Sequence, residues 1–305
     1  MEKYNALKRI SREDGISTLV TEIKDNLLRR EGAKYLKKVV GKRMHLKLLM
    51  YDQLEYWPNI KNPETFNENI AHRKLYTDEE AFAYIEDKWQ VREYVINKIG
   101  DEILPEVYYV TESPSSIPFE DLPSEYVIKP THMSGPVIIV DEDEEPDQEG
   151  MITSCIEWLD TTYGDIKEEY WYERITPRIL IEERLDVEGK DVPPDYKFFV
   201  FDGQVKYVQV DHDRFENHQK RLYDRDWNPQ EFEFNYPVGP VTERPANYER
   251  MVTIAEQLGK KFPFIRVDLY EVEDRIVFGE LTVAPASGLG KFVPKKYDHE
   301  FGSLW

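Results

Sequence analysis

Two apolar segments near the C-terminus carry charged residues at alternate positions, and this alternation constrains the fold more than any other feature of the sequence. Their sequences are Phe-Ile-Arg-Val-Asp-Leu-Tyr over 264–270 and Val-Phe-Gly-Glu-Leu-Thr over 277–282. Such alternation on both sides of a short turn predicts two paired β-strands. Successive side chains of a strand point to opposite faces, so Arg266 and Asp268 should share one face of the first strand. By the same rule, Phe278, Glu280 and Thr282 should share one face of the second strand.

The polar faces of these two strands form a candidate metal site. If the faces coincide, Asp268 and Glu280 converge beside Arg266. Two carboxylates and an arginine make a hard, oxygen-rich site that suits Mg²⁺ bridging the phosphates of a nucleotide. An ordinary cross-strand salt bridge on a solvated sheet face is the alternative. These residues alone leave both interpretations open.

The rest of the chain predicts helices followed by strands. Helical patterns cover Ser11 to Met50, a segment that Thr65 caps with Glu68 in its first turn, and Asp87 to Ile99. Strand patterns cover 106–111, 126–129, 137–140, 178–183, 197–201 and 206–210, with helical patterns at 151–163 and 248–258. A helical region followed by strands mixed with helices predicts an α+β protein, with its chemistry on the larger C-terminal sheet.

The charge of the chain limits its partners. With 60 acidic and 40 basic residues, the formal net charge is −20, which repels nucleic acid and anionic lipid at long range. We therefore expect no nucleic-acid partner. A basic cluster interrupts this acidity, and either a solvated helix face or a contact with anionic glycan or membrane fits it. Its members are Lys37, Lys38, Lys42, Arg43 and Lys47.

The cysteine content and the N-terminus indicate a cytoplasmic protein. The single cysteine, Cys155, rules out an intramolecular disulfide and fits a reducing compartment. We interpret it as an inert thiol, because no histidine or asparagine partner can be assigned to it. The N-terminal sequence MEKYNALKRISRED is too charged for a signal peptide, and no run of about eighteen apolar residues predicts a membrane span. Peripheral membrane contact and the oligomeric state stay open.

Two further segments carry candidate nucleotide contacts. An apolar strand at 126–129 delivers Lys129 into a turn that contains Ser134 and Gly135. Such a turn can present backbone N–H groups and one ammonium to a phosphate chain, although the spacing is not that of a P-loop and a plain β-hairpin also fits. A second apolar strand ends in Glu182 and Glu183, as if it ran into a hinge.

In chain order, these motifs resemble the ATP-grasp superfamily. More narrowly, they resemble the TupA-like ATP-grasp family over roughly residues 45–305. The resemblance implies a helical N-terminal region at 1–104 and two α+β lobes, at 105–178 and 179–305, that clamp a nucleotide. Members of the family are typically linked to the synthesis of teichuronopeptide and other surface polysaccharides. The segments that carry the resemblance are Pro-Glu-Thr-Phe-Asn-Glu-Asn-Ile at 63–70, Asp-Lys at 87–88, Val-Ile-Lys-Pro at 127–130, Asp-Tyr-Lys-Phe at 195–198, Arg-Val-Asp-Leu-Tyr at 266–270 and Phe-Gly-Glu-Leu-Thr at 278–282.

The resemblance also implies roles for single residues. The two proposed catalytic residues are Arg266, which would stabilise negative charge as a carboxylate attacks the γ-phosphate, and Lys129. Mg²⁺ would be carried by Asp268, Glu280 and Thr282. Thr282 departs from the superfamily, because many ATP-grasp ligases have asparagine there. The implied ATP contacts are Lys88 and Lys129 on the phosphates, Ser134 and Gly135 in the loop over them, Glu182, Glu183 and Leu185 along the adenine hinge, and Lys197.

The function implied by the resemblance is an ATP-dependent carboxylate–amine ligase. ATP would phosphorylate a carboxylate, and an amine would then attack the acyl phosphate to form an amide. By family analogy, the carboxylate is a uronic or other acidic group of a surface glycan or its precursor, and the amine is an amino acid or a small amine. Two alternatives stay open: a kinase that phosphorylates a sugar hydroxyl on the same scaffold, and a nucleotide-binding module without turnover.

Overall fold

The computed structural model describes residues 36–77, 80–142, 146–164, 168–185, 194–212 and 217–305, so the helix predicted from Ser11 lies largely outside the described residues. Its α-helices are α4 (Lys42–Leu54), α5 (Phe66–Tyr76), α6 (Glu80–Glu86), α7 (Val91–Lys98), α8 (Gln148–Leu159), α10 (Tyr248–Gly259) and α11 (Lys296–Ser303). Its strands are β1 (Val107–Thr111), β2 (Tyr126–Pro130), β3 (Ile138–Val140), β4 (Ile179–Glu182), β5 (Asp195–Phe201), β6 (Gln204–His212), β7 (Gln219–Asp224), β8 (Glu233–Phe234), β9 (Phe264–Val272), β10 (Arg275–Thr282) and β11 (Phe292–Val293). The α+β prediction is confirmed.

Helix α5 begins at the predicted cap. The Thr65 side chain accepts a hydrogen bond from the Glu68 amide, and the Glu68 carboxylate accepts one from the Thr65 amide. This reciprocal pair satisfies two amide groups that lack partners within the helix. The cap also fixes the direction in which Phe66, the first helical residue, enters the core, where its ring lies 4.9 Å from that of Phe264.

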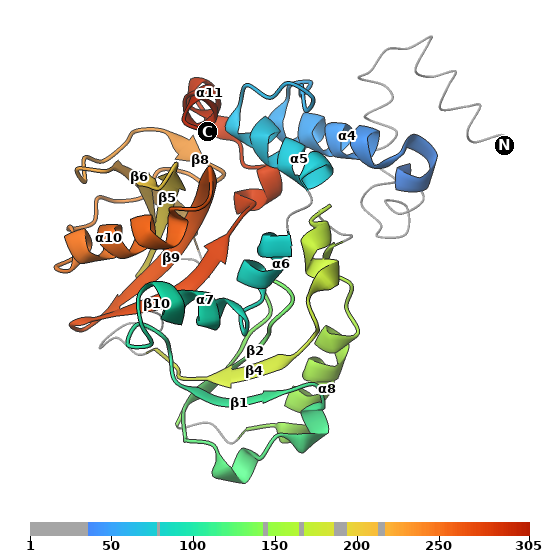
Figure 1. The fold of residues 1–305 in the computed structure, drawn as a ribbon, viewed down its shortest axis with the longest axis vertical. Coiled ribbons are helices and arrows are strands. Elements are labelled where there is room, and N and C mark those ends of the chain that lie inside the picture. The colour runs from blue at the N-terminus through green and yellow to red at the C-terminus, as the bar shows by residue number, and fades with distance from the viewer. Residues whose placement is uncertain (1–35, 78–79, 143–145, 165–167, 186–193, 213–216) are drawn as a thin grey trace.

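The smaller sheet has the strand order β1-β4-β2-β3, with all neighbours antiparallel. Strand β4 follows residue 178 in the chain, yet it lies between β1 and β2, so this sheet draws strands from both 105–178 and 179–305. Helix α8 contacts β2 and places Cys155 in the apolar core of this sheet. Figure 1 shows this sheet, with α8 beside it, below the larger one.

The larger sheet has the order β10-β9-β5-β6-β7, and it is also antiparallel throughout. Helix α10 covers one face, since its buried residues recur three and four positions apart and it contacts β9, β5 and β6. On the opposite face, phenylalanines at one end pack against Phe66 and Phe301. The charged residues of β5 and β9 continue along this same face.

The N-terminal helices are part of the larger lobe's core. Arg73 of α5 is buried and donates from Nη1 to the Val283 carbonyl at 2.7 Å and from Nη2 to the Phe264 carbonyl at 3.1 Å. Helices α6 and α7 lie between the two sheets (Figure 1). Within the described part of the chain, no helix has both the length and the apolar composition needed to cross a bilayer.

Candidate active site

Strands β9 and β10 pair in the register that brings the predicted carboxylates together. Asp268 lies opposite Glu280, and Arg266 lies opposite Thr282. The prediction that Phe278 shares their face is wrong, because a bulge at Gly279 shifts the register and Phe278 pairs with Leu269. Phe278 is therefore buried in the apolar core. A Cβ at Gly279 would lie 2.8 Å from the Tyr270 ring and 3.1 Å from the Asp268 carbonyl oxygen, so the bulge leaves little room for a side chain.

Arg266 connects the three polar residues of these strands. Its Nε and Nη2 donate to the two carboxylate oxygens of Asp268 at 2.6 and 2.7 Å. Nη2 also donates to Glu280 Oε1 and to the Thr282 hydroxyl, both at 2.9 Å. A planar guanidinium provides such parallel donors, whereas an ammonium does not. Arg266 Nη1 has no hydrogen-bond partner among the described residues.

Lys197 adds a second buried cation beneath Asp268. It lies opposite Asp268 in the β5–β9 register and donates to it at 2.7 Å, and it also forms an ion pair with Asp195. Burial lowers the pKa of Lys197, but Asp195 and Asp268 outweigh burial and raise it overall. Burial acts to raise the pKa of Asp268, and the cations Arg266 and Lys197 nevertheless hold it below its usual range. The ion pairs therefore favour the charged forms of Lys197 and Asp268.

Asp268 and Lys197 are withdrawn from solvent. Asp268 is 1 % exposed, and Lys197 is 5 % exposed. Burying a charged cluster costs free energy unless its members are paired, so such a cluster on a sheet face has no evident value for stability alone. The ion pairs of Asp268 and Lys197 are therefore buried, whereas Glu280, which pairs with Arg266 across the strands, keeps 35 % of its side chain exposed.

The residues present fit Mg²⁺ in part. Asp268 and Glu280 supply two carboxylates and Thr282 a hydroxyl, and Glu280 is more open than Asp268, with 35 % of its side chain exposed against 2 %. Mg²⁺ at a nucleotide site needs only one or two carboxylates, because phosphates and water complete its shell. The described residues contain no group of three or more His, Cys, Asp or Glu side chains arranged as a metal site by themselves. A site completed by phosphate oxygens agrees with both observations.

Two of the predicted lysines come from other elements: Lys129 from the smaller sheet, and Lys88 from the segment between α6 and α7. Lys129 of β2 forms an ion pair with Glu182 of β4. Lys88 follows α6 and donates to the Met133 carbonyl at 2.7 Å, at the start of the β2–β3 turn. Burial lowers the pKa of Lys88, while Glu280 is the strongest of the charges that oppose this shift. Lys88 therefore lies within electrostatic reach of Glu280 of β10 and of Lys129 and Glu182 of the smaller sheet.

The remaining predicted ATP contacts lie in several separate segments. Ser134 and Gly135 are exposed at the β2–β3 turn, and Gly135 has φ +110°, which favours glycine. Glu183 contacts two other segments of the protein. Its carboxylate accepts a hydrogen bond from the Glu106 amide at 3.0 Å and forms an ion pair with Arg275. Leu185 is half-buried and ends a described range.

One residue of the site was missed by the sequence analysis. Glu86 ends α6 and is buried, and it accepts hydrogen bonds from the Tyr172 hydroxyl at 2.6 Å and the Val283 amide at 2.8 Å. Burial raises the pKa of Glu86 to about 8, against the effect of these two donors. Its position directly before Asp87-Lys88, at the end of a short apolar helix, was the only available signal.

Cys155 takes no part in this arrangement. It is buried in the core of the smaller sheet, and burial raises the pKa of its thiol to about 11. A thiol of this kind is a poor nucleophile near neutral pH. The interpretation of Cys155 as an inert thiol agrees with its surroundings.

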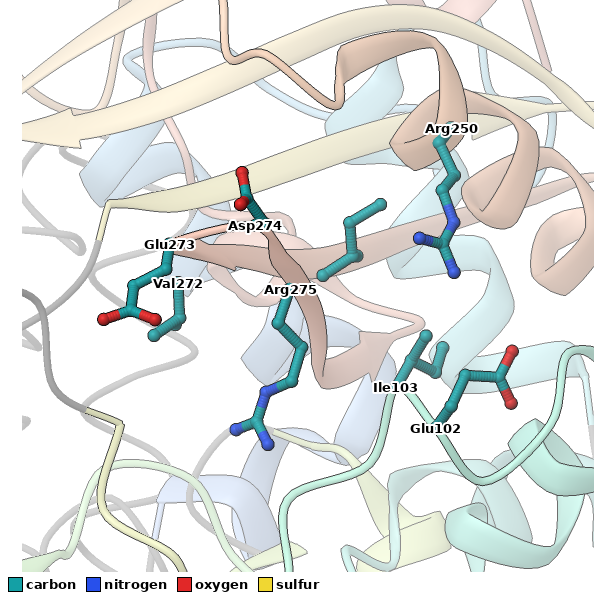
Figure 2. Close-up of a pocket in the computed structure, with 8 residues that line it drawn as sticks. Glu102, Ile103, Arg250, Val272, Glu273, Asp274 and Arg275 are labelled. Carbon is teal, nitrogen blue, oxygen red and sulfur yellow. The ribbon is translucent and has the colours of Figure 1, made fainter.

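A groove of about 380 Å³ lies at the turn between β9 and β10, away from the candidate site residues. Figure 2 shows Glu273, Asp274 and Arg275 at this turn, with Arg250 reaching in from α10 and Glu102 from the segment before β1. Both signs of charge line it, and Arg275 already pairs with Glu183. None of the predicted site residues contributes to its wall.

Solved structures that resemble this chain include ATP-grasp ligases at low identity. An ATP-grasp ligase PsnB complexed with a minimal precursor has 15% identity and a TM-score of 0.38, covering 68% of this chain and 54% of its own. A D-alanine–D-alanine ligase from Bacillus anthracis complexed with ATP has 16% identity and a TM-score of 0.41, covering 72% and 62%. The VanG D-Ala:D-Ser ligase from Enterococcus faecalis has 15% identity and a TM-score of 0.41, covering 67% and 54%. The chain thus spans less than two thirds of the length of these proteins.

The family of this chain is shown by its amino-acid sequence. No curated protein matches the chain. The structural TM-scores are low, so the family assignment rests on a sequence model that matches most of the chain and includes both halves of the site. The model covers residues 68–305 and agrees with the resemblance carried by the strand motifs. The chain belongs to the TupA-like ATP-grasp family.

Proposed function

We propose that this protein is a Mg-ATP-dependent carboxylate–amine ligase that acts through an acyl phosphate. The observation that carries the proposal is the hydrogen-bonded Asp268–Arg266–Glu280 network, whose Glu280 lies within electrostatic reach of Lys88. Phosphoryl transfer needs positioning and charge neutralisation more than covalent help from the protein. A fixed arginine, two carboxylates and facing lysines meet that need without a nucleophilic side chain.

Each part of the site has a place in this reaction. Lys88 and Lys129 would bind the phosphates, with the backbone of Ser134 and Gly135 above them. Asp268, Glu280 and Thr282 would hold Mg²⁺, which neutralises phosphate charge when it is bound. Arg266 would direct Nη1 at the negative charge that develops on the acyl group. The remaining ATP contacts would be Glu182, Glu183, Leu185 and Lys197. Lys197 would also stabilise the charged form of Asp268, to which it donates a hydrogen bond.

The proposed acceptor is a uronic or other acidic group of a surface glycan or its precursor, and the proposed amine is an amino acid or a small amine. Family membership supports this substrate class. It also supports the proposed location of the protein in the cytoplasm, where ATP and glycan precursors are made. A kinase acting on a sugar hydroxyl is the competing outcome of the tests below.

Binding of ATP is expected to require Mg²⁺. The chain has a net charge of −20, and two carboxylates lie where the triphosphate would bind, so cations must offset this repulsion. Titration calorimetry with ATP should give a Kd at least about tenfold weaker in excess chelator than with excess Mg²⁺, which corresponds to about 1.4 kcal/mol. Equal affinity under both conditions would remove Asp268 and Glu280 as proposed metal ligands.

The acyl phosphate can be trapped directly. Hydroxylamine converts an acyl phosphate into a hydroxamate and leaves a phosphorylated sugar unchanged. With ATP, Mg²⁺ and a uronate-containing acceptor, we expect hydroxamate together with ADP and free phosphate. A stable phosphate ester with no hydroxamate would identify a kinase and contradict the ligase proposal.

A further inference from the structure

The segment at the end of α6 contacts both lobes of the protein. Glu86 accepts a hydrogen bond from the Val283 amide, directly after β10, at 2.8 Å. Two residues after Glu86, the Lys88 amide donates to the Thr131 carbonyl at 3.2 Å, and the Lys88 ammonium donates to the Met133 carbonyl at 2.7 Å. Both carbonyls belong to the turn between β2 and β3. This short segment, which lies between the two sheets in Figure 1, therefore joins the end of β10 to the β2–β3 turn.

Both oxygens of the Glu86 carboxylate have a donor. Oε1 accepts from the Val283 amide, and Oε2 accepts from the Tyr172 hydroxyl at 2.6 Å. Glu86 is 9 % exposed, and burial raises its pKa to about 8. A carboxylate is costly to bury, and an apolar side chain of similar volume would serve packing at lower cost. Packing alone therefore does not account for a carboxylate at this position.

The backbone of Val283 is held at both its amide and its carbonyl. Strand β10 is an edge strand whose ladder ends at Thr282, and α6 rather than another strand contacts its open side. Glu86 gives the Val283 amide the acceptor that a neighbouring strand would otherwise supply. The Val283 carbonyl accepts from Arg73 at 2.7 Å. These contacts fix the end of β10 directly after Thr282, whose hydroxyl donates to Glu280 at 3.2 Å.

The residue between Glu86 and Lys88 is fixed as well. Asp87 is fully buried, and its Oδ1 accepts from the Trp89 amide at 2.9 Å and from the Gln90 amide at 3.3 Å. These bonds satisfy amide groups ahead of the first turn of α7, and they leave the chain from 86 to 88 little freedom to rotate. The position of Glu86 therefore determines where Lys88 lies.

We propose that Glu86 is a positioning residue that sets the separation between Lys88 and the metal-binding end of β10. Glu86 lies one residue away from Asp87 on the Lys88 side, and it bonds to the residue that follows Thr282 on the other. This role rests on the function proposed above, because it requires that the triphosphate of Mg-ATP bind between Lys88 and Thr282. Glu86 contacts neither of these side chains, so it acts through the backbone that carries them.

Glu86→Leu removes both hydrogen bonds and keeps a side chain of similar volume. We expect Kd for Mg-ATP, measured by titration calorimetry, to rise about tenfold, as for the loss of one hydrogen bond to a charged group. ADP release should show a fall in kcat of about the same size. In Glu86→Gln the amide oxygen can accept from Val283 and the amide nitrogen can donate to the Tyr172 oxygen, so both values should return to within about threefold of the wild type.

Asp298 of α11 provides a matched control for the loss of a buried carboxylate. It is 2 % exposed and receives the same two kinds of donor, the Tyr56 hydroxyl at 2.8 Å and the Asn67 amide at 3.0 Å. These donors lie on α5 and ahead of it, and neither is a predicted site residue. Asp298→Val and Glu86→Leu should both lower Tm, but well below Tm only Glu86→Leu should change Kd for Mg-ATP and kcat. An equal change in both folded variants would show that Glu86 acts through general stability, and would overturn the proposal.

Tyr172→Phe tests the same role without altering Glu86. It keeps the ring and removes the donor to Oε2, so we expect Kd for Mg-ATP to rise about fivefold, as for one neutral hydrogen bond. A folded Glu86→Leu with wild-type Kd and kcat would overturn the proposal, and if that variant does not fold, Tyr172→Phe with wild-type values would do so. A wild-type protein that binds Mg-ATP but forms no hydroxamate would refute the ligase function alone, since Kd still reports on Glu86. A wild-type protein that binds no Mg-ATP would overturn both.

Discussion

Glu280→Gln is expected to leave a folded protein whose turnover is lower by on the order of a hundredfold to a thousandfold. Glutamine keeps the shape of the side chain, and its amide oxygen can still accept from Arg266 and from Thr282, which now reach Glu280 at 2.9 and 3.2 Å. The substitution removes the negative charge that would hold Mg²⁺. Because 35 % of the side chain is exposed, the free energy of unfolding should change little.

Asp268→Asn provides the matched comparison. Asp268 is 1 % exposed and holds both Arg266 and Lys197, so neutralising it leaves two buried cations with one carboxylate fewer. Breaking a buried pair in this way costs about 3–5 kcal/mol, so this variant should lose thermal stability as well as turnover. Thermal unfolding followed by circular dichroism, alongside an ADP-release assay, separates the two effects. A Glu280→Gln protein with wild-type turnover would show that this carboxylate holds no essential metal.

Arg266→Lys is the second substitution with a large expected effect. The arginine uses two nitrogens to contact both oxygens of Asp268 and reaches Glu280 and Thr282 from one of them. A lysine ammonium keeps the charge but cannot present parallel donors, so the geometry around the developing negative charge is lost. We expect kcat to fall by on the order of a hundredfold or more, as when one donor to an oxyanion is removed.

The affinity for ATP provides the control for Arg266→Lys. If Lys88 and Lys129 bind the phosphates, calorimetry should give a Kd for Mg-ATP close to that of the wild type. Single-turnover measurement of hydroxamate then locates the loss in the chemical step. A variant that retains kcat and instead loses ATP affinity would assign Arg266 to nucleotide binding, and the proposed role in charge stabilisation would be wrong.

Local sequence patterns predicted most of the regular structure. The alternation in β9 and β10, the cap of α5 and the amphipathic period of α10 each depend on neighbouring residues only. Strand β7 was missed because its sequence, Gln-Lys-Arg-Leu-Tyr-Asp, opens with three polar residues and shows no clean alternation. The bulge at Gly279 was missed for a different reason: it depends on the position of the Tyr270 ring, across the hairpin.

The candidate site was predictable only where it lies on adjacent strands. Asp268 and Glu280 are joined by a short hairpin, so their convergence follows from register. Lys197 reaches Asp268 because β5 lies beside β9, although the two residues are 71 positions apart. Glu86 meets Tyr172 and Val283, which lie 86 and 197 positions further along the chain. No local pattern records such proximity, because it arises from the packing of whole elements.

The hydrogen bonds of Arg73 determine when the larger lobe can complete its folding during synthesis. Its partners, the carbonyls of Val283 and Phe264, lie 210 and 191 residues further along the chain. While a ribosome is still synthesising the last strands, helix α5 has already left the exit tunnel, and the two carbonyl acceptors at Phe264 and Val283 are not yet in place. Domains generally fold as units, so this one must wait for its C-terminal strands before Arg73 can make these two hydrogen bonds. The nascent chain should therefore remain incompetent for ATP hydrolysis, and in need of protection from aggregation, until translation is nearly complete.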